Sequence, residues 1–215
     1  MMGERSPLLG VIVSVFFLLP LSGCDQPHLS GIEAGKINPT RDPLQTLSRS
    51  DRPIVKEVKD GMFTLTPVAE YNISGVVVSK KRYKEGWEGE ISPIDLAIVW
   101  GKLAEPGYER DITFWQSQRW YFFKYGERSR LDHSTIATHS GNHHMIPATL
   151  NVRKALLSIQ KNDPVVLEGF LVNLKGTYKK KAVFWNTSLS RDDTGQNSCE
   201  LFYVSRVRID TKVYE

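Results

Sequence analysis

The stretch from residue 163 to 174 constrains the fold most, because it has the pattern of one long buried strand. Its apolar residues are mostly β-branched, and Gly169 lies in the middle, where a bend or bulge is typical. Directly before it, between residues 151 and 160, apolar side chains recur at spacings of three and four, which predicts a helix with one apolar face. We therefore expect a central strand preceded by a helix, with the last strand, 201–210, close to it.

The rest of the chain adds strands on both sides of this helix. Apolar or β-branched runs predict strands at residues 62–66, 73–79, 95–101, 112–116, 119–125 and 183–189. Pro67 ends the first of them and indicates an edge strand. Runs 112–116 and 119–125 together count as the third strand, after 73–79 and 95–101. The order of three strands, a helix and further strands resembles the OB-fold, a Greek-key barrel with its helix after the third strand. The expected class is mainly β with one helix (α+β), a small OB-fold-like barrel in which residues 126–147 form a long loop insertion.

The N-terminus carries the most specific motif. Residues 1–7 are polar, residues 8–21 are apolar, and the run ends in Leu21-Ser22-Gly23-Cys24. An apolar run of this length suits a secretory leader better than a membrane span. Its end resembles the lipobox of bacterial lipoproteins, which implies that Cys24 is acylated and becomes the first mature residue. In enteric lipoproteins, an aspartate at the position of Asp25 implies retention at the inner membrane.

These patterns divide the chain into three parts. Residues 1–23 are expected to be a lipoprotein signal peptide, 24–53 a flexible, proline-containing tether, and 54–215 a single OB-like β-barrel domain. The formal charge of the chain is +4. This charge is too small and too diffuse to predict nucleic-acid binding. The expected location is the periplasmic side of the cell inner membrane, held by the lipid anchor.

Three polar and aromatic stretches contain the candidate ligand-binding residues. They resemble a group of uncharacterised bacterial exported proteins that share a Trp-Gly, a Gln-x-x-Arg before aromatics, an Asn-x-His-x-Ile-Pro-Ala and a Ser-Leu-Ser-Arg-x-Asp-Thr-Gly ahead of Cys-Glu. No activity follows from this resemblance. The candidates are Trp100, Gln116, Arg119, Tyr121, Asn142, His144, Trp185, Ser188, Arg191 and Asp192. Flat rings and polar groups of these kinds are typical of ligand sites.

Two kinds of chemistry compete with simple binding. A small envelope hydrolase would use His144 as a base with Cys199 or Ser188 as nucleophile, but Ser188 lacks the Gly-x-Ser-x-Gly motif. A metal site would draw its ligands from His139, His143, His144, Asp192, Asp193 and Cys199. Against a metal, the glycine, asparagine and proline around these histidines predict a loop, so no metal or cofactor is expected.

The same residues also admit a purely structural role. Arg119 would pair with Asp192 or Glu200 and lie across Trp185, and Asn142 and His144 would satisfy backbone groups of a long loop. Weighing these alternatives, we expect a lipid-anchored binding or assembly module of the cell envelope with an envelope protein as partner. The sequence does not indicate the ligand or the oligomeric state.

Overall fold

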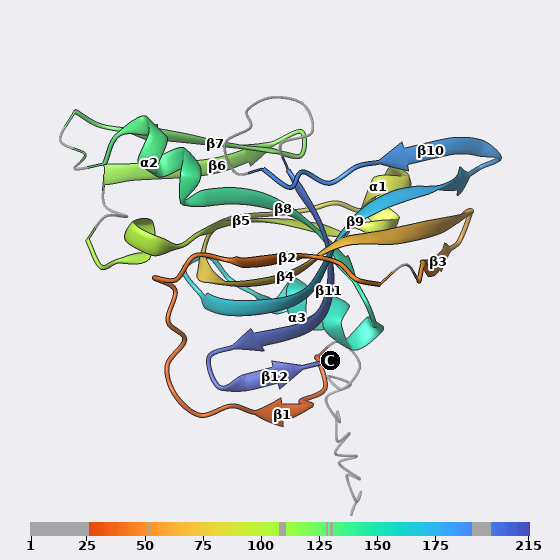
Figure 1. Cartoon of the computed structure of the whole chain (residues 1–215), viewed down its shortest axis with the longest axis horizontal. Coiled ribbons are helices and arrows are strands. Elements are labelled where there is room, and N and C mark those ends of the chain that lie inside the picture. The colour runs from red at the N-terminus through yellow and green to blue at the C-terminus, as the bar shows by residue number, and fades with distance from the viewer. Residues whose placement is uncertain (1–25, 51, 108–110, 128, 130, 191–198) are drawn as a thin grey trace, which may run out of the picture.

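The fold is mainly β with α+β character, as predicted (Figure 1). The computed structural model describes residues 26–50, 52–107, 111–127, 129, 131–190 and 199–215. Its strands are β1 (Gly31–Ile32), β2 (Leu44–Leu47), β3 (Ile54–Val58), β4 (Gly61–Arg82), β5 (Ile94–Val99), β6 (Ile112–Ser117), β7 (Trp120–Tyr125), β8 (Ser140–Pro147), β9 (Pro164–Tyr178), β10 (Lys181–Trp185), β11 (Glu200–Ile209) and β12 (Lys212–Tyr214). The helices are α1 (Gly86–Ile91), α2 (His133–Thr138) and α3 (Leu150–Ser158), with a 3₁₀ turn, η1 (Gly101–Ala104).

Five strands of the large sheet pair in a closed series. Strand β4 pairs with β5, β5 with β8, β8 with β11, β11 with β9, and β9 again with β4. All of these pairs are antiparallel except β8–β11, which is parallel. The remaining strands extend this arrangement at its margins, and β6 and β7 form a separate two-stranded sheet. Each of these five strands turns one of its two faces towards the main core.

The enclosed face holds the main core. Apolar side chains from the five strands meet Val152, Ala155 and Leu156 of α3, all of which are fully buried. Helix α3 confirms the predicted helix, and Thr149 caps it by accepting a hydrogen bond from the Val152 amide at 3.1 Å. At Gly169, a Cβ would lie 2.0 Å from the Tyr203 carbonyl oxygen, so only glycine allows β9 and β11 to approach this closely.

The prediction of two separate strands around Pro67 is wrong. Residues 61–82 form one long strand, β4, which pairs with four other strands and so is central. Pro67 sits at a register shift in the pairing of β4 with β9. A bulge needs no ladder donor at that position, so a proline is tolerated inside the strand.

The prediction of an irregular loop at 126–147 is wrong as well. This segment contains α2 and the strand β8, every residue of which is buried between β5 and β11. The sequence pattern predicted a loop here because β8 contains Asn142, His143 and His144, which are polar residues typical of loops. In the structure these side chains find partners on either side of the strand. The prediction of one helix also needs correction, since α1 and α2 are short helices inside predicted loops.

The segment predicted as a tether contributes two short strands to the sheet. Strand β1 pairs with β12, and β2 pairs with β4. The part between Gly31 and Leu47 is therefore hydrogen-bonded to the body at both ends, which corrects the expectation of a flexible coil there. Its extended backbone forms hydrogen bonds with N–H and C=O groups that would otherwise be unpaired at the exposed edges of the sheet. None of the helices in the described part of the chain is long and apolar enough to cross a bilayer.

Candidate functional site

The turn between β6 and β7 presents Arg119 to the outer face of the sheet. Gln118 and Arg119 have φ angles of 49° and 63°, as both central residues of a type I′ hairpin turn require. Residues other than glycine and asparagine adopt this conformation at a cost. The backbone carbonyl of Arg119 accepts a hydrogen bond from the Asn142 side-chain amide at 3.0 Å, which ties the turn to β8.

Asp95 is the buried anion to which this arginine binds. Its side chain is fully buried on β5, and Oδ1 accepts a hydrogen bond from Arg119 Nη1 at 2.8 Å. Arg119 Nη2 donates to the Ser92 carbonyl at 3.0 Å. His144 is the cross-strand neighbour of Asp95, and its Nδ1 lies 2.9 Å from the same Oδ1. Arg119 and His144 thus share one carboxylate oxygen, as a buried charge requires partners.

Two aromatic rings enclose the guanidinium group. Arg119 Cζ lies 3.9 Å from the ring centre of Tyr83 and 5.3 Å from that of Trp185. The Tyr83 hydroxyl accepts a hydrogen bond from the Arg119 amide at 3.1 Å. Burial, and then the nearby charge of Asp95, raise the pKa of Tyr83 to about 12. Trp185 also packs on His144, with ring centres 4.6 Å apart. The arginine is therefore held rigidly in cation–π geometry.

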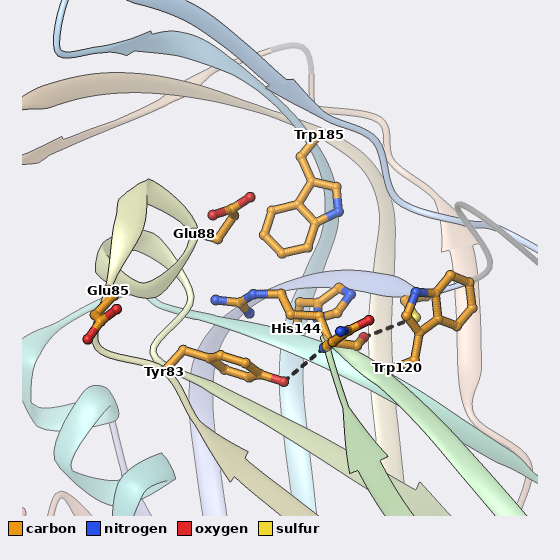
Figure 2. Close-up of a pocket in the computed structure, with 9 residues that line it drawn as sticks. Tyr83, Glu85, Glu88, Trp120, His144 and Trp185 are labelled. Carbon is orange, nitrogen blue, oxygen red and sulfur yellow. Dashed lines mark hydrogen bonds between the residues drawn. The ribbon is translucent and has the colours of Figure 1, made fainter.

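These side chains form the floor and walls of a pocket of about 470 Å³. Figure 2 shows Tyr83 and Trp120 on two sides, Trp185 above them in the view, Glu88 on α1 and Glu85 directly before this helix. The lining consists of Tyr83, Glu85, Glu88, Gln118, Arg119, Trp120, His144, Trp185 and Cys199. Aromatic walls with a few fixed polar groups are the usual composition of a small-ligand site.

Behind the pocket, Asn142 links the β6–β7 hairpin to β8. It is almost fully buried, and its Oδ1 accepts a hydrogen bond from Gln116 Nε2 at 2.6 Å. Its Nδ2 lies 3.7 Å from the Cys199 sulfur. Tyr121 donates to the Ser140 carbonyl at 3.1 Å, and burial raises its pKa to about 12. These contacts fix the hairpin, and with it the position of Arg119.

The structure brings together only part of the predicted residue set. Arg119, His144 and Trp185 line the pocket, whereas Trp100 is buried in the main core. Ser188 is buried in a tight turn, where its hydroxyl donates to the Ser190 carbonyl at 3.1 Å. Gln116, Tyr121 and Asn142 support the pocket from behind. Arg191 and Asp192 lie outside the described residues.

Sequence reasoning missed Asp95, Tyr83 and Ser92. A signal for Asp95 exists, because it is the single charged residue within the apolar strand Ile94–Val99. A buried strand rarely contains a carboxylate without a cationic partner. Tyr83 and Ser92 give no such signal, since they lie in a segment with the composition of an exposed loop. The predicted stacking of Arg119 on Trp185 is confirmed, but its described carboxylate partner is Asp95 and not Glu200.

The histidines do not converge as a metal site would require. His143 and His144 are adjacent on β8 and point to opposite faces of the strand. The His143 Nε2 lies 3.1 Å from the Tyr71 hydroxyl in the main core, and His144 faces Asp95. His139 ends α2, where its Nδ1 lies 2.9 Å from the Thr135 carbonyl. Among the described residues, no three His, Cys, Asp or Glu side chains gather to hold a metal ion.

Comparison with protein-family models, with curated proteins and with solved structures gives no match. The chemistry of the pocket itself is therefore the basis for assigning a function.

Proposed function

We propose that this chain is a lipid-anchored protein on the periplasmic side of the inner membrane, where its β body acts as a binding or assembly module of the envelope. The ligand or envelope protein partner binds in the pocket around Arg119. The observation that carries the proposal is the buried Asp95, which holds Arg119 and His144 in place beneath aromatic walls. Because these side chains are already held in place, a ligand would bind without paying the entropy cost of ordering them.

The anchor rests on the leader and its cysteine. The sequence Leu21-Ser22-Gly23-Cys24 follows an apolar run, and Asp25 comes next. Several acyl chains at Cys24 give a durable attachment, whereas a single chain gives only reversible binding. The first described strand, β1, begins at Gly31, so the acylated residue is only a few residues from the body.

The closed series of pairings supports an OB-like Greek-key barrel, with β4, β5, β8, β9 and β11 as its five strands. Helix α3 falls between the third and fourth of them, as in the OB-fold. OB-folds bind ligands on the face of strands two and three, between the loops that join strands one to two and four to five. Here Asp95 and His144 lie on the second and third strands, Tyr83 follows the first, and Trp185 lies between the fourth and fifth. This placement supports a binding role for the pocket.

Site-specific crosslinking in cells tests the binding role. A photoreactive benzoylphenylalanine at Gln118, which is exposed and lines the pocket, is expected to give a discrete adduct. The matched control is Gln160, an exposed glutamine after α3, which is expected to give none. Adding Trp185→Ala should weaken the Gln118 adduct. Equal adducts from both positions, or none from Gln118, would contradict the proposal.

A second candidate function is a small hydrolase, which one observation favours. His144 Nδ1 faces the Asp95 carboxylate, as the base of a catalytic triad faces its orienting group, and Cys199 lines the same pocket. Against it, the Cys199 side chain is buried, and it is followed by strand β11 and not by a helix whose N-terminus would lower its pKa. Ser188 is held in its turn, so only the cysteine version of this hypothesis remains.

The reactivity of Cys199 distinguishes the two functions. If the protein is a binding module, iodoacetamide should alkylate Cys199 at least about a hundredfold more slowly in the native protein than in 6 M guanidinium chloride, because the thiol is buried. Mass spectrometry of the peptide that contains Cys199 gives both rates. Fast native alkylation that His144→Ala slows would favour the hydrolase.

A further inference from the structure

A four-stranded extension of the sheet has one face that no described residues of the chain cover. It consists of β3, the first part of β4, the last part of β9 and β10, which pair in that order. One face packs into a second apolar cluster, which includes Phe63, Leu174 and Val183. Because side chains alternate along a strand, the residues between these point outward. Figure 1 shows the β3–β4 and β9–β10 hairpins on the same side of the molecule.

The outward side chains form two rows across the four strands. The strand registers place Glu57, Met62, Thr177 and Ala182 in one row, and Val55, Thr64, Lys175 and Phe184 in the other. Three large apolar side chains are exposed here: Val55 at 58%, Met62 at 54% and Phe184 at 78%. A cluster of exposed apolar side chains on one face marks an interaction surface more often than isolated ones do.

Lysines concentrate at the ends of the same two hairpins. Lys179 and Lys180 form the β9–β10 turn, Lys181 follows, and Lys59 lies in the β3–β4 turn. The two turns are adjacent, because the Lys179 amide donates to the Asp60 carbonyl at 2.8 Å. None of these lysines, nor Lys175, forms an ion pair within the described part of the chain.

The backbone conformation of the β9–β10 turn is unfavourable for lysine. Lys179 and Lys180 have φ angles of 48° and 64°, in a two-residue turn that favours Asn-Gly. A side chain in this left-handed conformation destabilises the turn, so a functional reason for the lysines is expected. Four lysines, Lys59, Lys175, Lys179 and Lys180, are accompanied by only two acidic residues of these hairpins, Glu57 and Asp60, whereas Lys181 shares the opposite face with Val183. Glu90 lies on the other face, where it accepts a hydrogen bond from Tyr178 at 2.8 Å.

We propose that this hairpin face, defined by Val55, Met62, Lys175, Phe184 and the turn lysines Lys59, Lys179 and Lys180, lies on the anionic surface of a phospholipid bilayer. The lysine ammonium groups bind lipid phosphates, and Phe184 and Met62 enter the headgroup region. Lysines beside phenylalanine and aliphatic side chains are the composition of surfaces that lie in the membrane interface. A soluble polyanion would bind the lysines but would gain nothing from the exposed Phe184.

The proposal rests on the proposed anchor in one respect, because acylated Cys24 holds the body at the bilayer. It adds that the body lies on the lipid by a particular face. The probe is the mature, acylated protein in the Cys199→Ala background, reconstituted into phosphatidylcholine vesicles with or without phosphatidylglycerol. A polarity-sensitive dye is attached at Phe184→Cys. The matched control is Leu150→Cys on α3, since Leu150 is equally exposed at 78%.

On vesicles with phosphatidylglycerol, the dye at position 184 is expected to shift to the blue and to be quenched by nitroxide lipids, while the dye at 150 is not. Lys179→Glu with Lys180→Glu should lower the membrane-facing fraction about tenfold, and so should 0.5 M salt. The control reversal Lys161→Glu, at an exposed lysine after α3, should not. Equal dye behaviour at both positions, in protein that floats with the vesicles, would overturn the proposal and leave the anchor intact. Protein that does not float with either kind of vesicle would overturn both.

Discussion

Replacing Cys24 with alanine is expected to abolish incorporation of labelled palmitate and to move most of the protein out of the sedimented membrane fraction. The physical reason is that the apolar run at residues 8–21 is short for a membrane span, so the proposed acyl chains would supply the attachment. Each buried methylene contributes about 0.8 kcal/mol, and several chains together give a durable anchor. Palmitate labelling followed by fractionation measures both effects.

The chain offers a matched control for this experiment. Cys199 is the second of two cysteines in the sequence and is buried in the body. Cys199→Ala makes the same chemical change and is expected to leave labelling and sedimentation unchanged. If Cys24→Ala protein sediments with membranes as completely as the parent protein, the lipid-anchor proposal is wrong.

Replacing Arg119 with alanine is expected to lower the free energy of unfolding by about 3 kcal/mol. Asp95 is fully buried, and removal of Arg119 leaves its carboxylate without the guanidinium, with the His144 ring as its remaining close neighbour. A buried charge that loses a partner is costly, and the stacking on Tyr83 is lost as well. Urea unfolding followed by tryptophan fluorescence measures the change.

A second substitution shows whether the buried charge is the cause. In the Arg119→Ala background, Asp95→Asn removes the negative charge and is expected to recover more than half of the lost stability. Arg153→Ala, at an exposed arginine of α3, is the control and should change stability by less than about 0.5 kcal/mol. If Arg119→Ala lowers the free energy of unfolding no more than Arg153→Ala does, the buried Asp95 carboxylate does not require Arg119 as a partner.

The parts of the fold that sequence predicted well are those with one clear period. The helix α3 follows from apolar residues at spacings of three and four, and β5, β9 and β11 follow from β-branched runs. Pro67 and the polar residues of β8 broke the pattern for a specific reason. A register shift accommodates the proline, and buried partners satisfy the polar side chains. Both are tertiary effects, which no local pattern can show.

The candidate site was predictable only in its individual members. Arg119, His144 and Trp185 drew attention because cationic, imidazole and indole groups stand out in polar stretches. The sequence did not show that these residues lie together around Asp95. The turn between β6 and β7 has to fold back onto β5 before Arg119 reaches Asp95. Pairing of this kind depends on the sheet topology. A charged residue within an apolar strand, as at Asp95, is the sequence feature that would direct a search for such partners.

The order of strand pairing also has a kinetic consequence. Gly61 of β4 pairs with Tyr178 of β9, and the ring is complete only when β11, close to the C-terminus, joins β8 and β9. Proteins dominated by such distant pairings fold in milliseconds to seconds, because long loops must close first. A chain synthesised from its N-terminus therefore stays open until nearly all of it has emerged. Slow completion of these pairings would leave the polypeptide open during synthesis, as passage through a membrane on the proposed secretory leader would require.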